Sequence, residues 1–326
     1  WIVHNPKRYE KKENVVFISR YHKINFKASY YSAVSKYFLF SHPYWLINWR
    51  KEQTVIYTTH SVAQLKSGTL KQKNEGKKWF DYILCSSDFS GEQRKNVFDI
   101  SEERLLKVGL PRIDLLFKNC QCIDKLIPNY NNEKIILCME TFKSSASFTD
   151  SESKNSFAIN IINNFDELKE LDTFLNYSSC IMIVKIHHLQ DMSKINMINL
   201  NNIYFILDNK LLDNNIQVNN LLKNADILLT DYSSVFYDYL ILDRPIGFLI
   251  SDMDEYKRGF IMDNPLDEMP GEKIENIEKL KSFINDCING CDSYREKRRV
   301  IKEKAFDYID DKNSERLFKW IDSQGG

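Results

Sequence analysis

Two adjacent serines, at positions 233 and 234, have surroundings that suggest a chemical role. They follow an apolar run that ends at Thr230 and precede a segment of helical spacing that begins at Val235. This pattern predicts a buried strand, then a polar turn, then a helix. Free N–H groups and the positive end of a helix dipole suit an anion at such a turn, phosphate above all. The turn consists of Asp231, Tyr232, Ser233 and Ser234. The alternative is that a serine only caps the helix and Asp231 only supports the turn.

Six histidines are candidates for proton transfer, and two of them end strand-like runs. His60 ends TVIYTTH, and His187 ends CIMIVKIH. An imidazole has an unperturbed pKa of about 6.5, so His60 is able to act as a general base near neutral pH. On the residues alone, a structural histidine at a strand end is the simpler interpretation. Lys185 alternates with Ile186 and lies on the same face as His187, where it supplies charge to a site or is simply solvated.

An ordered set of short motifs gives the chain a family resemblance. TDYSSVFYDY is followed by Arg244-Pro245, by the apolar run GFLISD and by YKRGF, residues 256–260. Over most of residues 30–265 the chain resembles the CDP-glycerol glycerophosphotransferase family, the teichoic-acid-type polyol-phosphate transferases of bacterial cell envelopes. The upstream motifs come in the family's order: Arg50-x-x-Gln53, His60 with Leu65-Lys66, Asp81-Tyr82, Ser86-Ser87, VGLPRID at 108–114, Thr141-Phe142-Lys143 and Lys185-Ile186-His187.

The resemblance implies roles for these residues. His60 would remove the proton from the acceptor hydroxyl, and His187 would donate a hydrogen bond to the donor phosphates or protonate the departing CMP. Arg112 and Asp114 match an interdomain element that is expected to orient the two domains through an ion pair. The remaining residues implied at the donor phosphates are Lys185, Asp231, Tyr232, Ser233, Ser234, Arg258 and Gly259; the planar fork of an arginine suits phosphate.

Two positions depart from the family pattern. Ser61 follows His60 where the family usually has glycine, which matters if the turn needs a positive φ or a close backbone approach. Lys143 stands where arginine is common. These departures are the support for one alternative, a non-catalytic family member that acts in binding or assembly. Another alternative keeps the fold and uses a nucleotide sugar as donor for surface polysaccharide assembly.

Composition sets limits on the class of protein. The 326 residues are 43% hydrophobic and 13% aromatic, which excludes wholesale disorder. Lys+Arg and Asp+Glu are both 45, so no basic excess points to a nucleic-acid partner. Five lysines between positions 66 and 78 form a solvated loop or a patch for anionic lipid. Seven scattered cysteines fit a reducing cytoplasm, and no apolar run reaches the ~20 residues that span a bilayer.

Strand-like and helix-like segments alternate along the chain and predict parallel sheets. Helices are expected at 91–98, 157–177, 217–224 and 235–242, and charged helices from about residue 273 either pack on the second sheet or cross back to the first. The Pro- and Asn-containing stretch 120–134 predicts a boundary, and 144–156 a loop. Strands are expected at 15–18, 37–40, 54–57, 82–85, 105–108, 134–139, 181–186, 203–207, 226–230 and 246–250.

We therefore expect an α/β fold of two Rossmann-like, doubly wound domains that face each other across a cleft, the glycosyltransferase-B arrangement that the resemblance also implies. Residues 1–125 would form the acceptor-side domain, which begins at Trp1 instead of Met and is compatible with a truncated N-terminus. Residues 126–326 would form the CDP-donor domain with the C-terminal helices.

The expected activity is the transfer of glycerol-phosphate or ribitol-phosphate from a CDP-polyol donor to a lipid-linked or polymeric acceptor, with release of CMP. Such an enzyme would work in the cytoplasm, at the inner face of the cell membrane, in teichoic-acid-like or capsule polymer synthesis. No cofactor or bound metal is required, because arginine, histidine and a helix N-terminus supply the positive charge, although Mg²⁺ is able to accompany the nucleotide.

Overall fold

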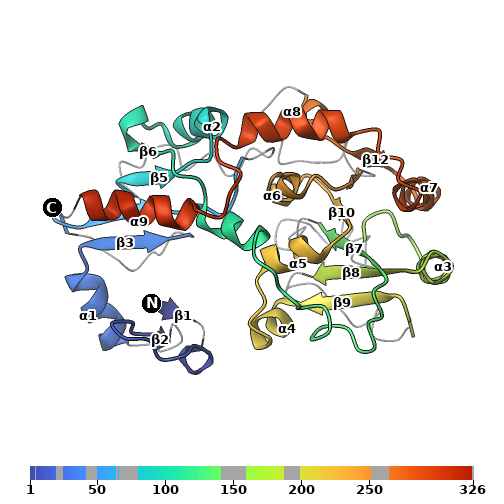
Figure 1. Cartoon of the computed structure of the whole chain (residues 1–326), viewed down its shortest axis with the longest axis horizontal. Helices are drawn as coiled ribbons and strands as arrows, with labels where there is room; N and C mark the ends of the chain where they lie inside the picture. The colour runs from blue at the N-terminus through green and yellow to red at the C-terminus, as the bar shows by residue number, and fades with distance from the viewer. Residues whose placement is uncertain are drawn as a thin grey trace, which may run out of the picture.

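The computed structural model of the chain describes residues 1–3, 5–19, 25–41, 50–63, 65, 80–140, 159–186, 199–250 and 264–324 (Figure 1). These residues form an α/β fold with two main parallel sheets, one in each half of the chain. The α/β class and the parallel sheets predicted from the sequence are confirmed.

The larger sheet has six parallel strands in the order β12-β11-β10-β7-β8-β9. Its chain order reverses between β7 and β10, which makes the sheet doubly wound and places a topological switch point there. β10 pairs with β7 on one side and with β11 on the other, so that Leu228, for example, lies opposite both Leu137 and Ile246. The strands are β7 (Lys134–Met139), β8 (Cys180–Ile186), β9 (Ile203–Leu207), β10 (Ile227–Thr230), β11 (Ile246–Leu249) and β12 (Glu272–Ile274).

The smaller sheet belongs to the first half and has the order β3-β4-β5-β6. Its parallel strands run in chain order, so among the described residues the doubly wound order is complete only in the larger sheet. A separate parallel pair, β1 (Ile2–Val3) and β2 (Ile18–Ser19), lies near the N-terminus (Figure 1). The four strands are β3 (Tyr37–Phe40), β4 (Thr54–Tyr57), β5 (Tyr82–Leu84) and β6 (Leu105–Leu106).

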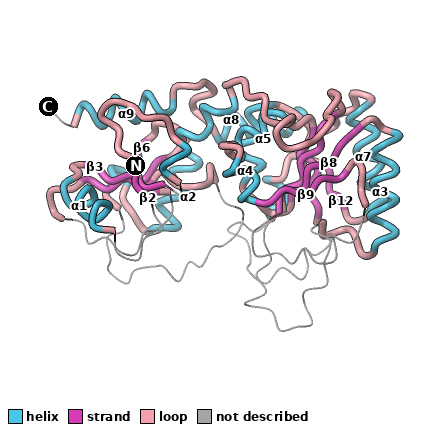
Figure 2. The backbone as a smooth tube through the Cα atoms, turned by 90° about the horizontal axis from the view of Figure 1, so that it is seen from below, coloured by secondary structure: helices cyan, strands magenta, loops and turns pink. Residues whose placement is uncertain are grey.

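Helices cover both faces of the larger sheet. α3 (Phe165–Tyr177) and α7 (Ile277–Ile288) lie together at one side of the molecule in Figure 2 and share a buried apolar cluster with the strands. Each begins at an asparagine cap: Asn164 accepts from the N–H of Glu167, and Asn276 from that of Lys279, both at 2.9 Å. The other face carries α4 (Asp208–Asp213), α5 (Val218–Asn224), α6 (Val235–Tyr239) and the 3₁₀ helix η7 (Leu240–Leu242).

The first half contains the helices α1 (Phe26–Val34) and α2 (Asp88–Phe98). Gln53, just before β4, donates to the carbonyls of Ser32 and Ser35 at 2.7 and 2.8 Å and so joins the end of α1 to the sheet. Short 3₁₀ helices complete the described structure: η1 (Pro6–Arg8), η3 (Glu102–Arg104), η4 (Pro111–Leu116) and η9 (Pro265–Glu268).

The last two helices, α8 (Arg295–Ala305) and α9 (Asn313–Ser323), cross back to the first half (Figure 1). α8 packs against α2, and Trp320 of α9 meets Tyr82 of β5 edge to face with 4.8 Å between ring centroids. Both alternatives left open by the sequence therefore occur, because α7 stays on the larger sheet while α8 and α9 return to the smaller one. The division at residue 125 stays a prediction.

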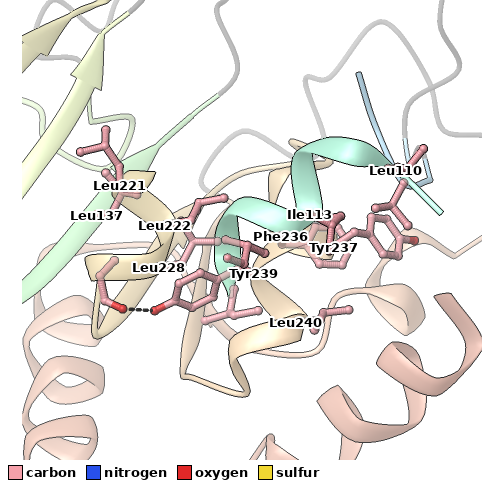
Figure 3. Packing of buried hydrophobic residues seen from close by; sticks show 14 of the residues in the cluster. Leu110, Ile113, Leu137, Leu221, Leu222, Leu228, Phe236, Tyr237, Tyr239 and Leu240 are labelled. Carbon is pink, nitrogen blue, oxygen red and sulfur yellow. Dashed lines mark hydrogen bonds between the residues drawn. The ribbon is translucent and has the colours of Figure 1, made fainter. Parts of the chain in front are cut away.

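One apolar cluster joins the two halves. Leu110 and Ile113, at and within η4, pack close to Phe236, Tyr237 and other buried residues of the second half, as Figure 3 shows. The buried hydroxyl of Tyr239 donates to the carbonyl of Ala225 at 2.9 Å. The 3₁₀ helix η4, which follows β6 of the smaller sheet, and α6, which follows β10 of the larger sheet, therefore pack in one apolar core.

The strand positions expected from the sequence agree with the structure to within a few residues, and the stretch between η4 and β7 contains no helix or strand. The expected loop at 144–156 lies outside the described residues. All seven cysteines are free, and Cys85, Cys138 and Cys180 are buried as expected from their apolar surroundings. No helix within the described ranges combines the length and apolarity needed to cross a membrane.

Candidate active site at two strand-end turns

The turn after β10, residues 231–234, is held from within and is called here the serine turn. Asp231 is buried, and its carboxylate accepts from the N–H of Ser233 at 2.9 Å. The preceding Thr230 donates its hydroxyl to the carbonyl of Met139 at 2.6 Å, which fixes the tip of β10 against β7 at the switch point. Asp231 therefore supports the turn, as the sequence suggested.

Ser233 and Ser234 are only partly buried. Ser234 occupies the N-cap position of α6, but its side chain makes no capping hydrogen bond. Within the part of the chain that the structure describes, neither serine hydroxyl has a hydrogen-bond partner. The capping role is thus not observed, and both hydroxyls are available to a ligand. Tyr232, by contrast, is 1% exposed and lies in the apolar cluster, so its side chain serves packing.

The short helix α6 is anchored by an ion pair to the first half. Arg112 of η4 donates from Nε and Nη2 to the two carboxylate oxygens of Asp238 at 2.7 and 2.8 Å. Asn219 adds a bond to Asp238 at 3.3 Å. Arg112 therefore forms an ion pair, as expected, with a residue of the second half of the chain. Asp114 has a different role, because it caps α9 by accepting from the N–H groups of Asn313 and Ser314, both at 2.9 Å.

The second turn, residues 58–62, follows β4 and is called here the histidine turn. His60 is exposed, as a proton-transfer group must be to meet its substrate. Thr59 has a φ of +53°, a left-handed conformation that a β-branched residue rarely adopts. Ser61 is 1% exposed and does not have a positive φ. The strained position is therefore Thr59, and Ser61 does not distort the turn in the way its departure from glycine suggested.

A buried arginine lies under the histidine turn. Arg94 of α2 is 3% exposed and donates to three backbone carbonyls: Leu84 at 2.8 Å, Ser61 at 2.6 Å and Val62 at 3.0 Å. Burial, together with the nearby charge of Arg112, lowers the pKa of its guanidinium to about 10. Neither Arg94 nor the strain at Thr59 was predicted. No sequence signal marks them, because both depend on how the turn folds over α2.

The two turns are brought onto the same core. Val62 of the histidine turn and Phe236, two residues after the serine turn, belong to one buried cluster. Phe89, in the first turn of α2 after β5, lies near Tyr237 of α6 with 6.5 Å between ring centroids. Both α2 and α6 follow the carboxyl ends of their strands, so these ends of the two sheets approach each other, where ligands of such sheets bind.

The two cysteines at these strand ends are not suited to nucleophilic chemistry. Burial raises the pKa of the Cys85 thiol, next to β5, to about 11. Burial and the neighbouring carboxylates of Glu140 and Asp231 hold the pKa of the Cys138 thiol, in β7, well above its usual range. A thiolate is the reactive form, so both side chains act as small apolar residues.

Of the remaining predicted site residues, only Lys185 lies within the described ranges. Lys185 forms an ion pair with Asp208 at 2.7 Å, so part of its charge is already balanced. His187, Arg258, Gly259 and Lys143 lie outside the described residues, and their roles stay predictions. Within the described ranges no three His, Cys, Asp or Glu side chains are grouped to hold a metal ion.

Comparison with known proteins gives a consistent group. The sequence profile described as CDP-Glycerol:Poly(glycerophosphate) glycerophosphotransferase matches residues 1–323. A teichoic acid glycerol-phosphate transferase of Staphylococcus aureus is 27% identical over 258 residues, which cover 76% of this chain and 62% of that protein. A teichoic acid glycerol-phosphate primase of Bacillus subtilis is 27% identical over 310 residues, which cover 85% of this chain and 70% of that protein.

A longer relative and a solved structure add to this group. A teichoic acid poly(glycerol phosphate) polymerase of Staphylococcus epidermidis is 26% identical over 300 residues, 81% of this chain but only 39% of its own length. The chain thus spans less than two thirds of the polymerase and of the S. aureus transferase. The structure of the wall teichoic acid polymerase TagF has a TM-score of 0.74 at 23% identity, covers 99% of this chain and is itself 80% covered. The two share a fold.

Proposed function

Because the match extends over residues 1–323, the chain belongs to the CDP-glycerol:poly(glycerophosphate) glycerophosphotransferase family, and we propose that it transfers polyol phosphate from a CDP-linked donor. The polyol is glycerol or ribitol, the acceptor is lipid-linked or polymeric, and CMP is released. The match over nearly the whole chain is the observation that carries this proposal. The two strand-end turns on one core support it, since one offers a proton acceptor and the other a place for an anion.

In the proposed reaction, an acceptor hydroxyl attacks the β-phosphorus of the CDP-polyol. A new P–O bond forms to the acceptor, the bond from this phosphorus to the bridging oxygen breaks, and CMP departs with the electron pair. His60 takes the proton of the attacking hydroxyl as general base. The exposed position of His60 on a turn held by Arg94 supports this role.

The serine turn would bind the donor diphosphate. Phosphoryl transfer depends mostly on positioning and on donors that face the developing charge. Two serine hydroxyls without a partner in the described structure, together with the N–H groups at the start of α6, can supply such donors. His187, Arg258 and Gly259 would complete the phosphate site, and Lys185 would add charge. No resident cofactor is proposed, and Mg²⁺ would enter only with the nucleotide.

We also propose peripheral attachment at the cytoplasmic face of the membrane, where a lipid-linked acceptor is reached. Helix α1 supports this, because Phe26, Tyr30 and Val34 recur every four residues on one face and are 80%, 62% and 53% exposed. Exposed aromatic and aliphatic side chains on one helical face suit the membrane interface. Changing all three to serine should reduce co-sedimentation with anionic vesicles; unchanged sedimentation would exclude α1 as the anchor.

The direct test of the reaction is CMP release from CDP-glycerol and, separately, from CDP-ribitol. Each donor is offered with a lipid-linked disaccharide or a glycerol-phosphate primer, and without acceptor as control. Acceptor-dependent CMP from one donor establishes the reaction and identifies the polyol. Absence of CMP from both donors, combined with absence of CDP-polyol binding, would contradict the proposal and favour a nucleotide-sugar donor.

A further inference from the structure

Arg94 is a buried cation that, among the described residues, is bound only by backbone atoms. All three of its hydrogen bonds go to carbonyl oxygens, and within the described ranges no carboxylate lies at ion-pair distance from it. Arg298 of α8 offers a contrast: it is 1% exposed, but its guanidinium is paired with the carboxylate of Asp292. Burial of a cation without a counter-charge costs folding free energy. An apolar side chain at this position would avoid that cost but would not bind the three backbone carbonyls.

The carbonyls that Arg94 binds lie in the histidine turn and at the end of β5. Two of them belong to Ser61 and Val62, the residues directly after His60, and the third belongs to Leu84 at the end of the neighbouring strand. Arg94 therefore connects the histidine turn with the carboxyl end of β5. One side chain fixes the chain on the C-terminal side of His60.

The residue on the other side of His60 is strained. Thr59 has its left-handed φ of +53° immediately before the histidine, and strain of this kind persists only where the surroundings hold it. Thr59 and Arg94 line the same small surface hollow, together with Tyr57 and Phe98. Without the guanidinium, the carbonyls of Ser61 and Val62 lose these hydrogen bonds, and the strained turn is freer to relax.

We propose that Arg94 is a positioning residue for the transfer reaction: by binding the carbonyls of Ser61 and Val62 it holds the strained turn so that the exposed His60 imidazole stays where the acceptor hydroxyl is deprotonated. This inference rests on the proposed function, in which His60 is the base. A general base must lie within hydrogen-bond reach of its proton, and a misplacement of about 1 Å is able to reduce turnover about 100-fold.

The test compares Arg94→Met and Arg94→Lys with the matched control Arg298→Met, by kcat and KM for CDP-glycerol and by Tm. We expect Arg94→Met to lower kcat by about 10- to 100-fold while KM stays within about twofold, since the donor binds elsewhere. Arg94→Lys, which keeps the charge and a donor, should recover part of kcat. Arg298→Met should lower Tm and leave kcat within about twofold, as a purely structural change does.

A double variant separates positioning from a general loss of structure. Arg94→Met in a His60→Ala background should cause no further loss, because there is no longer an imidazole to position. A further 10-fold loss there, or an Arg94→Met enzyme with normal kcat, overturns the proposal. Should Arg94→Met fail to fold, Arg94→Lys carries the same comparison.

Hydrogen–deuterium exchange makes the test independent of the reaction. In Arg94→Met, exchange should rise in peptides that cover residues 55–65 and stay unchanged in those that cover residues 227–240. If the wild-type protein releases no CMP from either CDP-polyol while Arg94→Met shows this exchange pattern, only the proposed function is contradicted. An unchanged exchange rate at residues 55–65 contradicts the role of Arg94 whatever the reaction is.

Discussion

The histidine turn and the serine turn both follow the carboxyl end of a parallel strand, yet the protein holds them in different ways. The histidine turn is supported from below by a buried guanidinium and contains a residue in a strained left-handed conformation. The serine turn is held by its own carboxylate, has no strained residue and keeps two hydroxyls without a partner among the described residues.

This difference matches what the two roles need. A general base works only from a narrowly defined position, so a rigid and costly support is useful under His60. Phosphate oxygens accept hydrogen bonds from several directions, so a phosphate site depends more on free donors than on one fixed side chain. The comparison predicts that changes at the histidine turn affect turnover and changes at the serine turn affect donor affinity.

The largest expected effect is that of His60→Ala. General-base catalysis contributes about 10²- to 10⁴-fold, so we expect kcat to fall by about three orders of magnitude. The dissociation constant for CDP-glycerol, measured by calorimetry, should change less than about twofold because the donor rests on the other turn. A parallel loss of donor affinity would contradict the division between the turns.

The anchor of the serine turn is expected to have the next largest effect. Asp238→Asn leaves Arg112 without its counter-charge, and because the pair is only partly buried we expect a loss of about 2 kcal/mol in unfolding free energy. Donor affinity should fall as α6 loses its fixed orientation. Lys279→Ala is the control, since it breaks an exposed pair with Glu275 and should leave the unfolding free energy nearly unchanged. Equal losses of unfolding free energy in Asp238→Asn and Lys279→Ala, measured by urea unfolding, would show that the ion pair of Asp238 with Arg112 does not stabilise the fold.

Ser234→Ala should weaken donor binding without a change in stability. Its hydroxyl has no partner in the described structure, so removing it costs the folded protein little. A hydrogen bond to a charged oxygen contributes about 1.5–3 kcal/mol, which predicts a loss of affinity of about 10-fold or more. Ser323→Ala at the end of α9 is the control and should bind the donor normally. Normal affinity in Ser234→Ala would remove this serine from the site.

The smallest effect is expected at Ser61, where the sequence departs from its family. The hydroxyl of Ser61 is buried and lacks a hydrogen-bond partner in the described structure, while the backbone does not need glycine there. Ser61→Ala should therefore raise the unfolding free energy by about 1 kcal/mol, seen as a small rise in Tm, and leave kcat unchanged. A large loss of activity would show that the hydroxyl itself takes part in the reaction.

The sequence predicted the elements that show a recognisable apolar run or a periodic hydrophobic pattern. Apolar runs such as Lys134–Met139 and Ile203–Leu207 are strands at their expected positions, and the serine turn follows β10 as expected. The two-residue strand β1 and the short edge strand β12 were missed because so few residues carry no readable alternation.

The support of the histidine turn could not be predicted for a different reason. Arg94 lies 34 positions after His60, and its partners are backbone carbonyls, which have no signature in side-chain sequence. The left-handed φ of Thr59 runs against the preference of a β-branched residue, so propensity points away from it. Both features exist only because the turn closes over α2.

The most direct test of the division between the two turns is single-turnover CMP release at saturating CDP-polyol, compared between His60→Ala and Ser234→Ala. Saturation should bring Ser234→Ala close to the wild-type rate, because its defect is in binding, and should leave His60→Ala about 1,000-fold slower. If saturation instead restores His60→Ala, or if Ser234→Ala stays slow when fully loaded with donor, the assignment of chemistry to one turn and binding to the other is wrong.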